Sequence, residues 1–379
     1  MIRVVVVEDS ALFRRALCAA LQSDPELHVV AEARNGREGV ALVLQHRPDI
    51  VTMDVNMPLL NGYEAAEQIM ALCPTRIVIV AGSPTKQEEQ GIMRALSLGV
   101  LDVVAKPDLL RPQGQQQARE LIDKLKILSK ARVLRHLTGL FKRLNEEPAQ
   151  TSAVPAYALH LTGLVQPPQE ALPVPAPKPE SWRVVAIASS TGGPAALARI
   201  VSLLPGDLGG AIVVAQHIAE GFTPMLVNWL DSLTPLKVVE AEAGAALIPG
   251  TMVVGPSGRH LQVNASGKLE LLDTPAVHGC RPSGDVLLIS VARVFGSRAV
   301  GVILTGMGCD GTEGAQAIQR HGGLVYAQDE STCVIFGMPR SAIEAGAANR
   351  VLPLDNFSLE ITRLLGRQES SACKDTPCR

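Results

Sequence analysis

Residues 184–193 read VVAIASSTGG, and this stretch decides the fold of the C-terminal half of the chain. The apolar run Val184–Ala188 is typical of a buried strand in a parallel sheet. It breaks into small hydroxyl residues and two glycines, where backbone amides can approach a ligand closely. We therefore expect the Ser190 hydroxyl at the carboxyl end of a strand, which is where open α/β sheets place their sites.

Two further chemical groups follow apolar runs in the same way. His217 comes directly after residues 211–216, and Asp310 lies shortly after residues 299–304. A serine hydroxyl attacks an ester only when a base removes its proton, and a histidine can do that near neutral pH. A carboxylate fixes the imidazole tautomer and stabilises its cation. Ser190, His217 and Asp310 therefore form a candidate catalytic triad.

The developing oxyanion of such a reaction needs hydrogen-bond donors. The candidates are the backbone amides around Thr191, Gly192 and Met307, because glycines flank both places. The order Ser, His, Asp differs from that of known triads, and there is no G-x-S-x-G motif at Ser190. Two alternatives stay open: a nucleotide-binding or anion-binding module with residues 190–193 as its phosphate loop, and a non-catalytic response regulator.

Composition limits the class of protein. The chain has 379 residues, of which 47% are hydrophobic, 19% charged and 3% aromatic, with 33 glycines, and this favours two or three α/β domains. The net charge of −2 gives no general attraction to nucleic acid or membrane. The seven cysteines are scattered without a C-x-x-C motif, so neither a disulfide framework nor a zinc ribbon is expected. No apolar stretch approaches the roughly 20 residues of a membrane span, so we expect a cytoplasmic protein that is not embedded in a membrane.

The apolar runs predict two α/β domains joined by a linker. Residues 2–7 form a buried strand pattern, and strand patterns alternate with helical ones at 28–31, 49–53, 76–81 and 101–105. Residues 115–144 form one amphipathic helical pattern, and eight prolines between 148 and 180 predict an extended tether. The predicted divisions are an N-terminal α/β domain at 1–123, a helical and Pro-rich linker at 124–181, a catalytic domain at 182–367 and a disordered tail at 368–379.

Acidic residues gather at the strand ends of the first domain. Glu8 and Asp9 end the first strand, Asp54 ends the third and Lys106 ends the fifth. Three converging carboxylates repel one another and favour a hard divalent cation with oxygen ligands, and Mg²⁺ also neutralises an incoming phosphoryl group. Asp54 is then the expected phosphoacceptor and Lys106 the partner of the new anion.

The motifs VVVVEDS, DIVTMDVNMP and VVAKP resemble those of a two-component receiver domain. The resemblance implies a five-stranded, doubly wound parallel sheet, phosphorylation of Asp54, and Mg²⁺ on Glu8, Asp9 and the carbonyl of Asn56. It also implies a chemotaxis histidine kinase as phosphodonor. One departure concerns the family's switch Ser or Thr, which falls at Gly82, with Ser83 as a substitute.

The motifs AIASSTGGPAAL, VVAQH, CRPSGDVLL, VILTGMGCDG and YAQDESTCVIFGMPRSAI resemble the catalytic domain of CheB-type chemotaxis protein-glutamate methylesterases over residues 183 to about 353. The resemblance implies a second doubly wound, mostly parallel α/β sheet with Ser190, His217 and Asp310 as the triad. It implies demethylation of glutamate γ-methyl esters on methyl-accepting chemoreceptors with release of methanol. It also implies deamidation of receptor glutamines, no cofactor for the esterase, and control through phosphorylation of the receiver.

Overall fold

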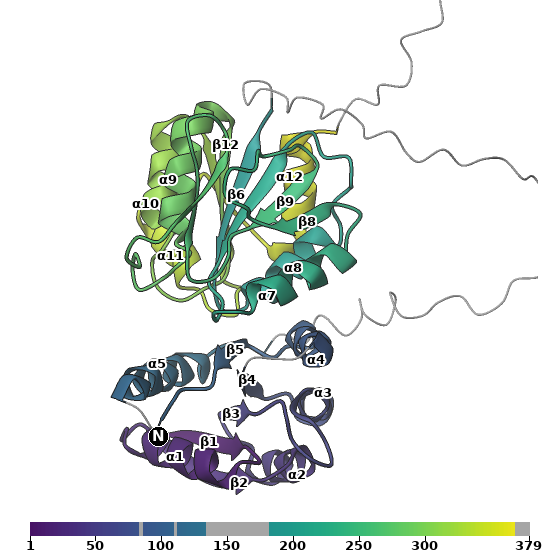
Figure 1. The fold of residues 1–379 in the computed structure, drawn as a ribbon, viewed down its shortest axis with the longest axis vertical. Helices are drawn as coiled ribbons and strands as arrows, with labels where there is room; N and C mark the ends of the chain where they lie inside the picture. Colours follow the sequence, from purple (N-terminus) through teal and green to yellow (C-terminus); the bar gives the residue numbers. More distant parts are fainter. Residues whose placement is uncertain (83–85, 110–111, 134–181, 368–379) are drawn as a thin grey trace, which may run out of the picture.

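The computed structural model describes residues 1–82, 86–109, 112–133 and 182–367. These form two α/β domains, one above the other in Figure 1, with the receiver-like domain below. The predicted tether and tail, and Ser83, lie outside the described residues.

The N-terminal domain is a five-stranded parallel sheet in the order β2-β1-β3-β4-β5. Its strands are buried because Val, Ile and Ala fill both faces between the helical layers. The predicted strands are confirmed to within two residues at each end. The elements are β1 (Ile2–Val7), α1 (Ala11–Gln22), β2 (Leu27–Ala33), α2 (Gly36–His46), β3 (Ile50–Met53), α3 (Gly62–Leu72), β4 (Arg76–Ala81), α4 (Lys86–Ser97), β5 (Asp102–Ala105) and α5 (Pro112–Leu128).

The last helix of this domain is shorter than the helical pattern in the sequence. Helix α5 runs past the predicted division at residue 123 to Leu128, and Leu125 and Leu128 still face the core. The sequence predicts one helical pattern over 115–144, yet the helix ends at Leu128 and turns follow it. There the amides of residues 129–131 bond back to carbonyls three and four residues earlier, and Ala131 accepts a hydrogen bond from the Arg76 guanidinium at 2.7 Å. Residues 134–144 lie outside the described part of the chain.

The C-terminal domain is built on a seven-stranded sheet in the order β14-β13-β12-β6-β7-β9-β8. Every pair of neighbouring strands in it is parallel, and the antiparallel hairpin β10-β11 lies outside it. The elements are β6 (Val184–Ser189), α7 (Gly193–Val201), β7 (Ala211–Gln216), α8 (Thr223–Ser232), β8 (Lys237–Glu240), β9 (Thr251–Val254), β10 (His260–Val263), β11 (Leu269–Leu272), α9 (Gly284–Phe295), β12 (Ala299–Ile303), α10 (Thr312–Arg320), β13 (Leu324–Gln328), α11 (Met338–Glu344), β14 (Arg350–Leu352) and α12 (Phe357–Leu365).

The central strand β6 shows why this sheet is buried on both faces. Val185 and Ile187 pack in the same core as α7, α8 and α12, whereas Val184 and Ala186 pack in the core of α9, α10 and α11. The chain leaves β6 toward β7 on one side, and β12 pairs with its other side. This reversal of strand order places β6 at the topological switch point, where open sheets bind ligands.

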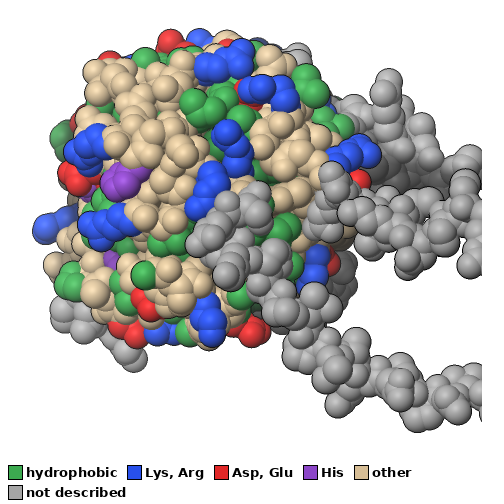
Figure 2. Space-filling view, turned by 90° about the horizontal axis from the view of Figure 1, so that it is seen from above, with side chains coloured by type: hydrophobic (Ala, Val, Ile, Leu, Met, Phe, Trp, Pro, Cys, Tyr) green, Lys and Arg blue, Asp and Glu red, His purple; other side chains and the backbone are tan. Residues whose placement is uncertain are grey.

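The two domains contact each other beside the carboxyl ends of the C-terminal sheet. Helix α4 packs against α7 and α8, and β5 and the middle of α5 line a cavity together with the loops that follow β6 and β7 (Figure 1). The opposite face of the catalytic domain carries Lys and Arg side chains interspersed with polar and hydrophobic ones (Figure 2), so basic charge is dispersed there. Among the described residues, every helix is too short or too polar to span a bilayer.

Candidate active site

The loop after β6 positions Ser190. The Ser190 amide donates a hydrogen bond to the carbonyl of Thr305 at 3.0 Å, and its carbonyl accepts one from the Gly193 amide at 2.7 Å. Between them Gly192 adopts a left-handed conformation with φ of +77°, and a Cβ there would lie 2.7 Å from the Val334 side chain. The turn therefore requires glycine, and helix α7 begins immediately after it.

The loops after the two neighbouring strands supply the other two predicted residues. His217 follows β7, Asp310 lies between β12 and α10, and His217 Nε2 is 2.7 Å from Asp310 Oδ2. The Asp310 carboxylate is buried, and both oxygens accept further bonds. Oδ1 accepts from Ser283 Oγ at 2.7 Å and the Asp285 amide at 3.1 Å, and Oδ2 accepts from the Gly284 amide at 2.5 Å. The start of α9 thus holds the carboxylate, and Ser283 also caps that helix.

The ion pair shifts both pKa values. Burial favours the neutral form of each group, but their hydrogen bond and opposite charges act the other way. For His217 these contacts, together with a neighbouring Cys280, raise the pKa to about 9. The pKa of Asp310 is lowered, because the bonds from His217, Ser283 and the Asp285 amide outweigh its burial. Asp310 is therefore ionised at neutral pH and can orient and stabilise an imidazolium.

Ser190 and His217 line one cavity of about 380 Å³. Within the described residues the Ser190 hydroxyl makes no hydrogen bond with His217, so the structure joins His217 to Asp310 but does not join Ser190 to His217. Such contacts commonly tighten only when substrate binds. Asp102, Leu121 and Lys124 of the receiver-like domain line the same cavity, and they narrow the approach to Ser190 from that side.

Sequence reasoning missed a clamp between the two catalytic loops. Gln216 is buried, and its Nε2 donates to the carbonyls of Ser190 at 2.9 Å and His217 at 2.7 Å. Its Oε1 accepts a 2.6 Å hydrogen bond from the Ser189 hydroxyl, which gives that buried hydroxyl a partner. Gln216 was only the last residue of an apolar run in the sequence, and nothing local indicated its partners 26 residues away.

The predicted oxyanion residues differ in their surroundings. Thr191 is buried, its carbonyl accepts from the Thr305 hydroxyl at 3.0 Å, and its own hydroxyl donates to Asp102 of the receiver-like domain at 2.9 Å. Gly192 lies directly before α7, so its amide is at a helix N-terminus. Met307 is 38% exposed on the loop that carries Asp310, and it is not among the residues that line the cavity of Ser190 and His217.

The acidic cluster of the N-terminal domain is brought together as predicted from the strand ends. One carboxylate oxygen from each of Glu8, Asp9 and Asp54 lies within 4.8 Å of the others. Lys106 Nζ is 2.9 Å from Glu8 and 2.8 Å from Asp54. Burial raises the pKa of Glu8 and of Asp54, and the Lys106 ammonium opposes that shift. This all-oxygen donor set fits a hard divalent cation.

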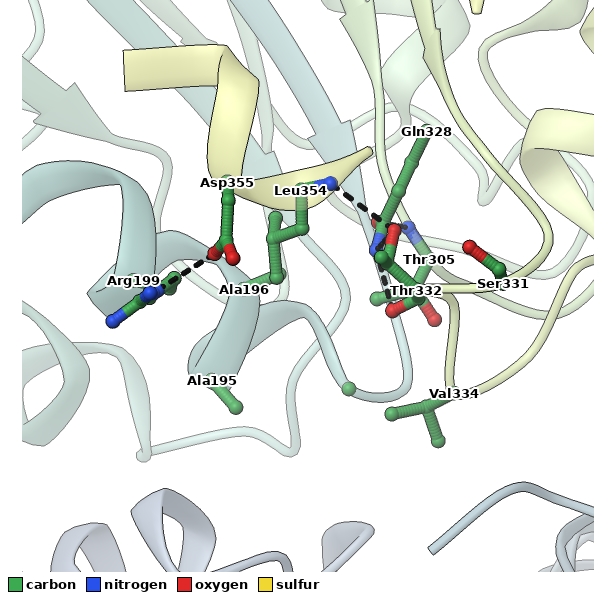
Figure 3. Close-up of a pocket in the computed structure, with 11 residues that line it drawn as sticks. Ala195, Ala196, Arg199, Thr305, Gln328, Ser331, Thr332, Val334, Leu354 and Asp355 are labelled. Atoms are coloured by element: carbon green, nitrogen blue, oxygen red, sulfur yellow. Dashed lines mark hydrogen bonds and ion pairs between the residues drawn. The ribbon is translucent and has the colours of Figure 1, made fainter. Parts of the chain in front are cut away.

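A second cavity of about 350 Å³ lies behind the loop after β6, between α7 and the segment 328–334 (Figure 3). Its polar groups largely satisfy one another. Arg199 pairs with Asp355 at 2.8 Å, and Gln328 bonds to the Thr305 amide and to Thr332. None of the three predicted triad residues lines it. The cavity with Ser190 and His217 is therefore the candidate active site.

Comparison with known proteins defines the class. The family model for the response regulator receiver domain matches residues 4–111, and the model for CheB methylesterase matches residues 185–361. The chain is therefore a response regulator with an esterase domain. A protein-glutamate methylesterase/protein-glutamine glutaminase of Symbiobacterium thermophilum is 42% identical over 366 residues, covering 96% of this chain and 97% of that protein.

A relative of the same name from Pyrococcus abyssi is 37% identical over 371 residues, covering 96% of this chain and 93% of that protein. The Thermotoga maritima CheB methylesterase catalytic domain, known from a crystal structure, is 41% identical to this chain. The match covers 48% of this chain and 99% of the crystallised domain, with a TM-score of 0.48. The chain belongs to the protein-glutamate methylesterase/protein-glutamine glutaminase family, and it is an enzyme of that class.

Proposed function

We propose that this enzyme hydrolyses glutamate γ-methyl esters on methyl-accepting chemoreceptors and deamidates receptor glutamines, with Ser190, His217 and Asp310 as its triad. The observation that carries the proposal is the 2.7 Å contact between His217 and Asp310 on the wall of the cavity that Ser190 also lines. Adjacent strands β12, β6 and β7 supply the three residues, each at its carboxyl end. The two reactions share one acyl intermediate, so one site serves both.

The chemistry follows from the imidazole's orientation. His217 faces Asp310 through Nε2, so in the neutral ring Nδ1 can accept the proton of the Ser190 hydroxyl, and this neutral form grows as pH rises toward the raised pKa of about 9. Ser190 Oγ attacks the ester carbonyl carbon, and the oxyanion forms near the amides of Thr191–Gly193 or of the Met307 loop. Methoxide then leaves with the proton from His217. Water repeats the sequence on the acyl-enzyme, with His217 first accepting and then returning a proton, and releases the glutamate.

The test is methanol release from methylated receptor by two serine variants. Ser190→Ala should lower turnover by about 10⁶, as is typical when a triad nucleophile is removed. Ser189→Ala is the matched control, because it removes the neighbouring buried hydroxyl, which bonds only to Gln216. It should retain most of the activity. If Ser190→Ala kept most of the activity, the nucleophile would have been assigned wrongly.

We propose that phosphorylation of Asp54 controls the esterase, with a chemotaxis histidine kinase as phosphodonor in the cytoplasm. Glu8, Asp9 and Asp54, with the carbonyl of Asn56, would hold Mg²⁺, which neutralises the charge of the incoming phosphoryl group. Lys106 already pairs with Asp54 at 2.8 Å and would pair with the phosphoryl oxygens. Asp54→Asn should abolish labelling by a small phosphodonor, and undiminished labelling would place the phosphate elsewhere.

The proposed control acts through the docked receiver. Its β5 and α5 line the Ser190 cavity, and Asp102 accepts the hydrogen bond from Thr191, the residue that follows the nucleophile. Lys124 holds the same Asp102 oxygen at 2.9 Å, so the carboxylate is fixed toward the cleft. A nearly complete switch between docked and released forms needs about 5.5 kcal/mol of differential stabilisation. Deleting residues 1–145 should raise basal turnover, and unchanged turnover would argue against occlusion.

A further inference from the structure

A third kind of side chain lies beside the predicted triad. Cys280, in the loop before α9, is half-buried as a free thiol and lines the same cavity as His217. One ligand atom each from His217, Cys280 and Asp310 lies within 4.8 Å of the others. These residues come from three separate loops, so the fold, and no sequence motif, brings them together.

The donor set distinguishes this place from the acidic cluster of the receiver. A thiolate, an imidazole nitrogen and a carboxylate oxygen are ligands of Zn²⁺, whereas Mg²⁺ favours oxygen alone. We propose that Cys280, His217 and Asp310 form a binding site for a thiophilic divalent cation, with Zn²⁺ as the probe, and that the bound cation inhibits the esterase. The inhibition, though not the binding, rests on the proposed role of His217 as base.

The geometry suits a three-ligand site with one open position. Ligands of a tetrahedral zinc ion lie about 3.5 Å apart, given metal–ligand bonds of about 2.0–2.3 Å. His217 Nε2 and Asp310 Oδ2 share a 2.7 Å hydrogen bond, so they must part by about 0.8 Å to admit the ion, and one ligand atom of Cys280 lies within 4.8 Å of both. The cavity of about 380 Å³ on the open side has room for water as the fourth ligand. The Ser283 hydroxyl and the amides of Gly284 and Asp285 hold the Asp310 carboxylate in place, so this ligand is already oriented before the cation binds.

Inhibition follows from shared atoms. A metal bound to His217 Nε2 replaces the contact with Asp310 that orients the ring, and the imidazole proton then lies on Nδ1, the atom that would take the Ser190 proton. The esterase would therefore stop while the cation is bound and recover when a chelator removes it. Mg²⁺ would not inhibit the esterase in this way, because it favours the oxygen ligands of the receiver site over thiolate and imidazole.

The experiment measures Co²⁺ binding by its thiolate-to-metal absorption band, and Zn²⁺ by displacement of that band. The protein carries Ser190→Ala and Asp54→Asn, so that neither turnover nor the receiver site contributes. Cys280→Ser should abolish the band and weaken Zn²⁺ binding at least about tenfold. Cys309→Ser is the matched control, because Cys309 is exposed in the loop beside Asp310 but lies outside the cluster. It should leave both unchanged.

In the otherwise unaltered enzyme, Zn²⁺ should inhibit methanol release reversibly, and Cys280→Ser should raise the inhibitory concentration by the same factor. A band that persists in Cys280→Ser, or one that disappears in Cys309→Ser, overturns the site. A wild-type protein that lacks the band altogether does the same. If the band forms as expected but no variant or wild-type form shows esterase activity, the cation site stands and the proposed function fails.

Discussion

Replacing Asp310 by asparagine separates the chemical role of this carboxylate from its structural one. The two oxygens face different donors: Oδ1 faces Ser283 and the Asp285 amide, and Oδ2 faces the Gly284 amide and His217. An amide keeps only one oxygen. Whichever way it turns, its NH₂ meets a backbone N–H that cannot become an acceptor. One buried donor is left unpaired, which costs about 1–3 kcal/mol of folding free energy.

The effect on catalysis should be far larger than this structural loss. Without the negative charge, His217 loses the partner that fixes its tautomer and stabilises its cation. The equivalent change in a serine protease lowers kcat by about 10⁴, and we expect a similar loss here. Stability falls at the same time, by roughly 2–4 °C of melting temperature for each kcal/mol in a domain of this size.

The assay pairs methanol release with thermal unfolding, and Ser283→Ala serves as the control. That variant removes one donor to Oδ1 and the cap of α9, but it leaves the carboxylate and its contact with His217. It should lose about 1 kcal/mol of stability and less than tenfold in turnover. An Asp310→Asn enzyme that is destabilised yet turns over within tenfold of wild type would show that Asp310 only anchors α9, and the triad would be refuted.

Three further predictions concern the interface, the receiver and pH. Asp102→Ala removes the receiver's hydrogen bond to Thr191, worth about 1.5 kcal/mol, and should raise basal methanol release by up to about tenfold. Asp123→Ala, on the exposed face of α5, is the control and should not raise it. Equal effects of the two substitutions would show that this hydrogen bond does not hold the receiver in place. Gly82→Thr should increase activation by phosphodonor, because among the described residues, chain neighbours apart, none lies within 4 Å of a Cβ there. An unaltered ratio of stimulated to basal activity would count against it. The raised pKa of His217 stabilises the fold fully below pH 6.5, and this stability is lost as pH rises through about 9. The free energy of unfolding in urea, wild type minus His217→Gln, should therefore fall by up to about 3 kcal/mol over that interval. A difference that does not change with pH would contradict the ion pair.

Strand ends were the most predictable part of this molecule. Apolar runs located β1, β3 and β5, so the residues that follow them, Glu8, Asp54 and Lys106, could be placed at one edge of a sheet. The same argument located Ser190, His217 and Asp310 after β6, β7 and β12. Period and burial determine where a strand stops, and both can be read from local sequence.

Contacts that depend on how loops meet could not be predicted. The Gln216 clamp, the Asp102–Thr191 bond and the position of Cys280 beside His217 join residues 26 to 89 positions apart. The cysteines looked scattered in the sequence because a pairing of Cys with His across loops has no fixed spacing. The length of α5 was misjudged for a related reason. Its apolar stripe continues in the sequence, whereas the turns at residues 129–131 and the bond from Arg76 end the helix.

These contacts bear on how the receiver can govern the esterase. A lid that only blocks entry would need bulk over the cleft and no particular bond. Here the receiver's Asp102 instead holds the hydroxyl of Thr191, whose carbonyl and neighbouring residues are fixed by Thr305 and Gln216. The nucleophile loop therefore has an anchor in each domain. Under the proposed control, release of the receiver would change the restraint on the proposed oxyanion amides as well as access to Ser190. Since both effects depend on one short loop, a modest change in docking free energy can alter binding and turnover together.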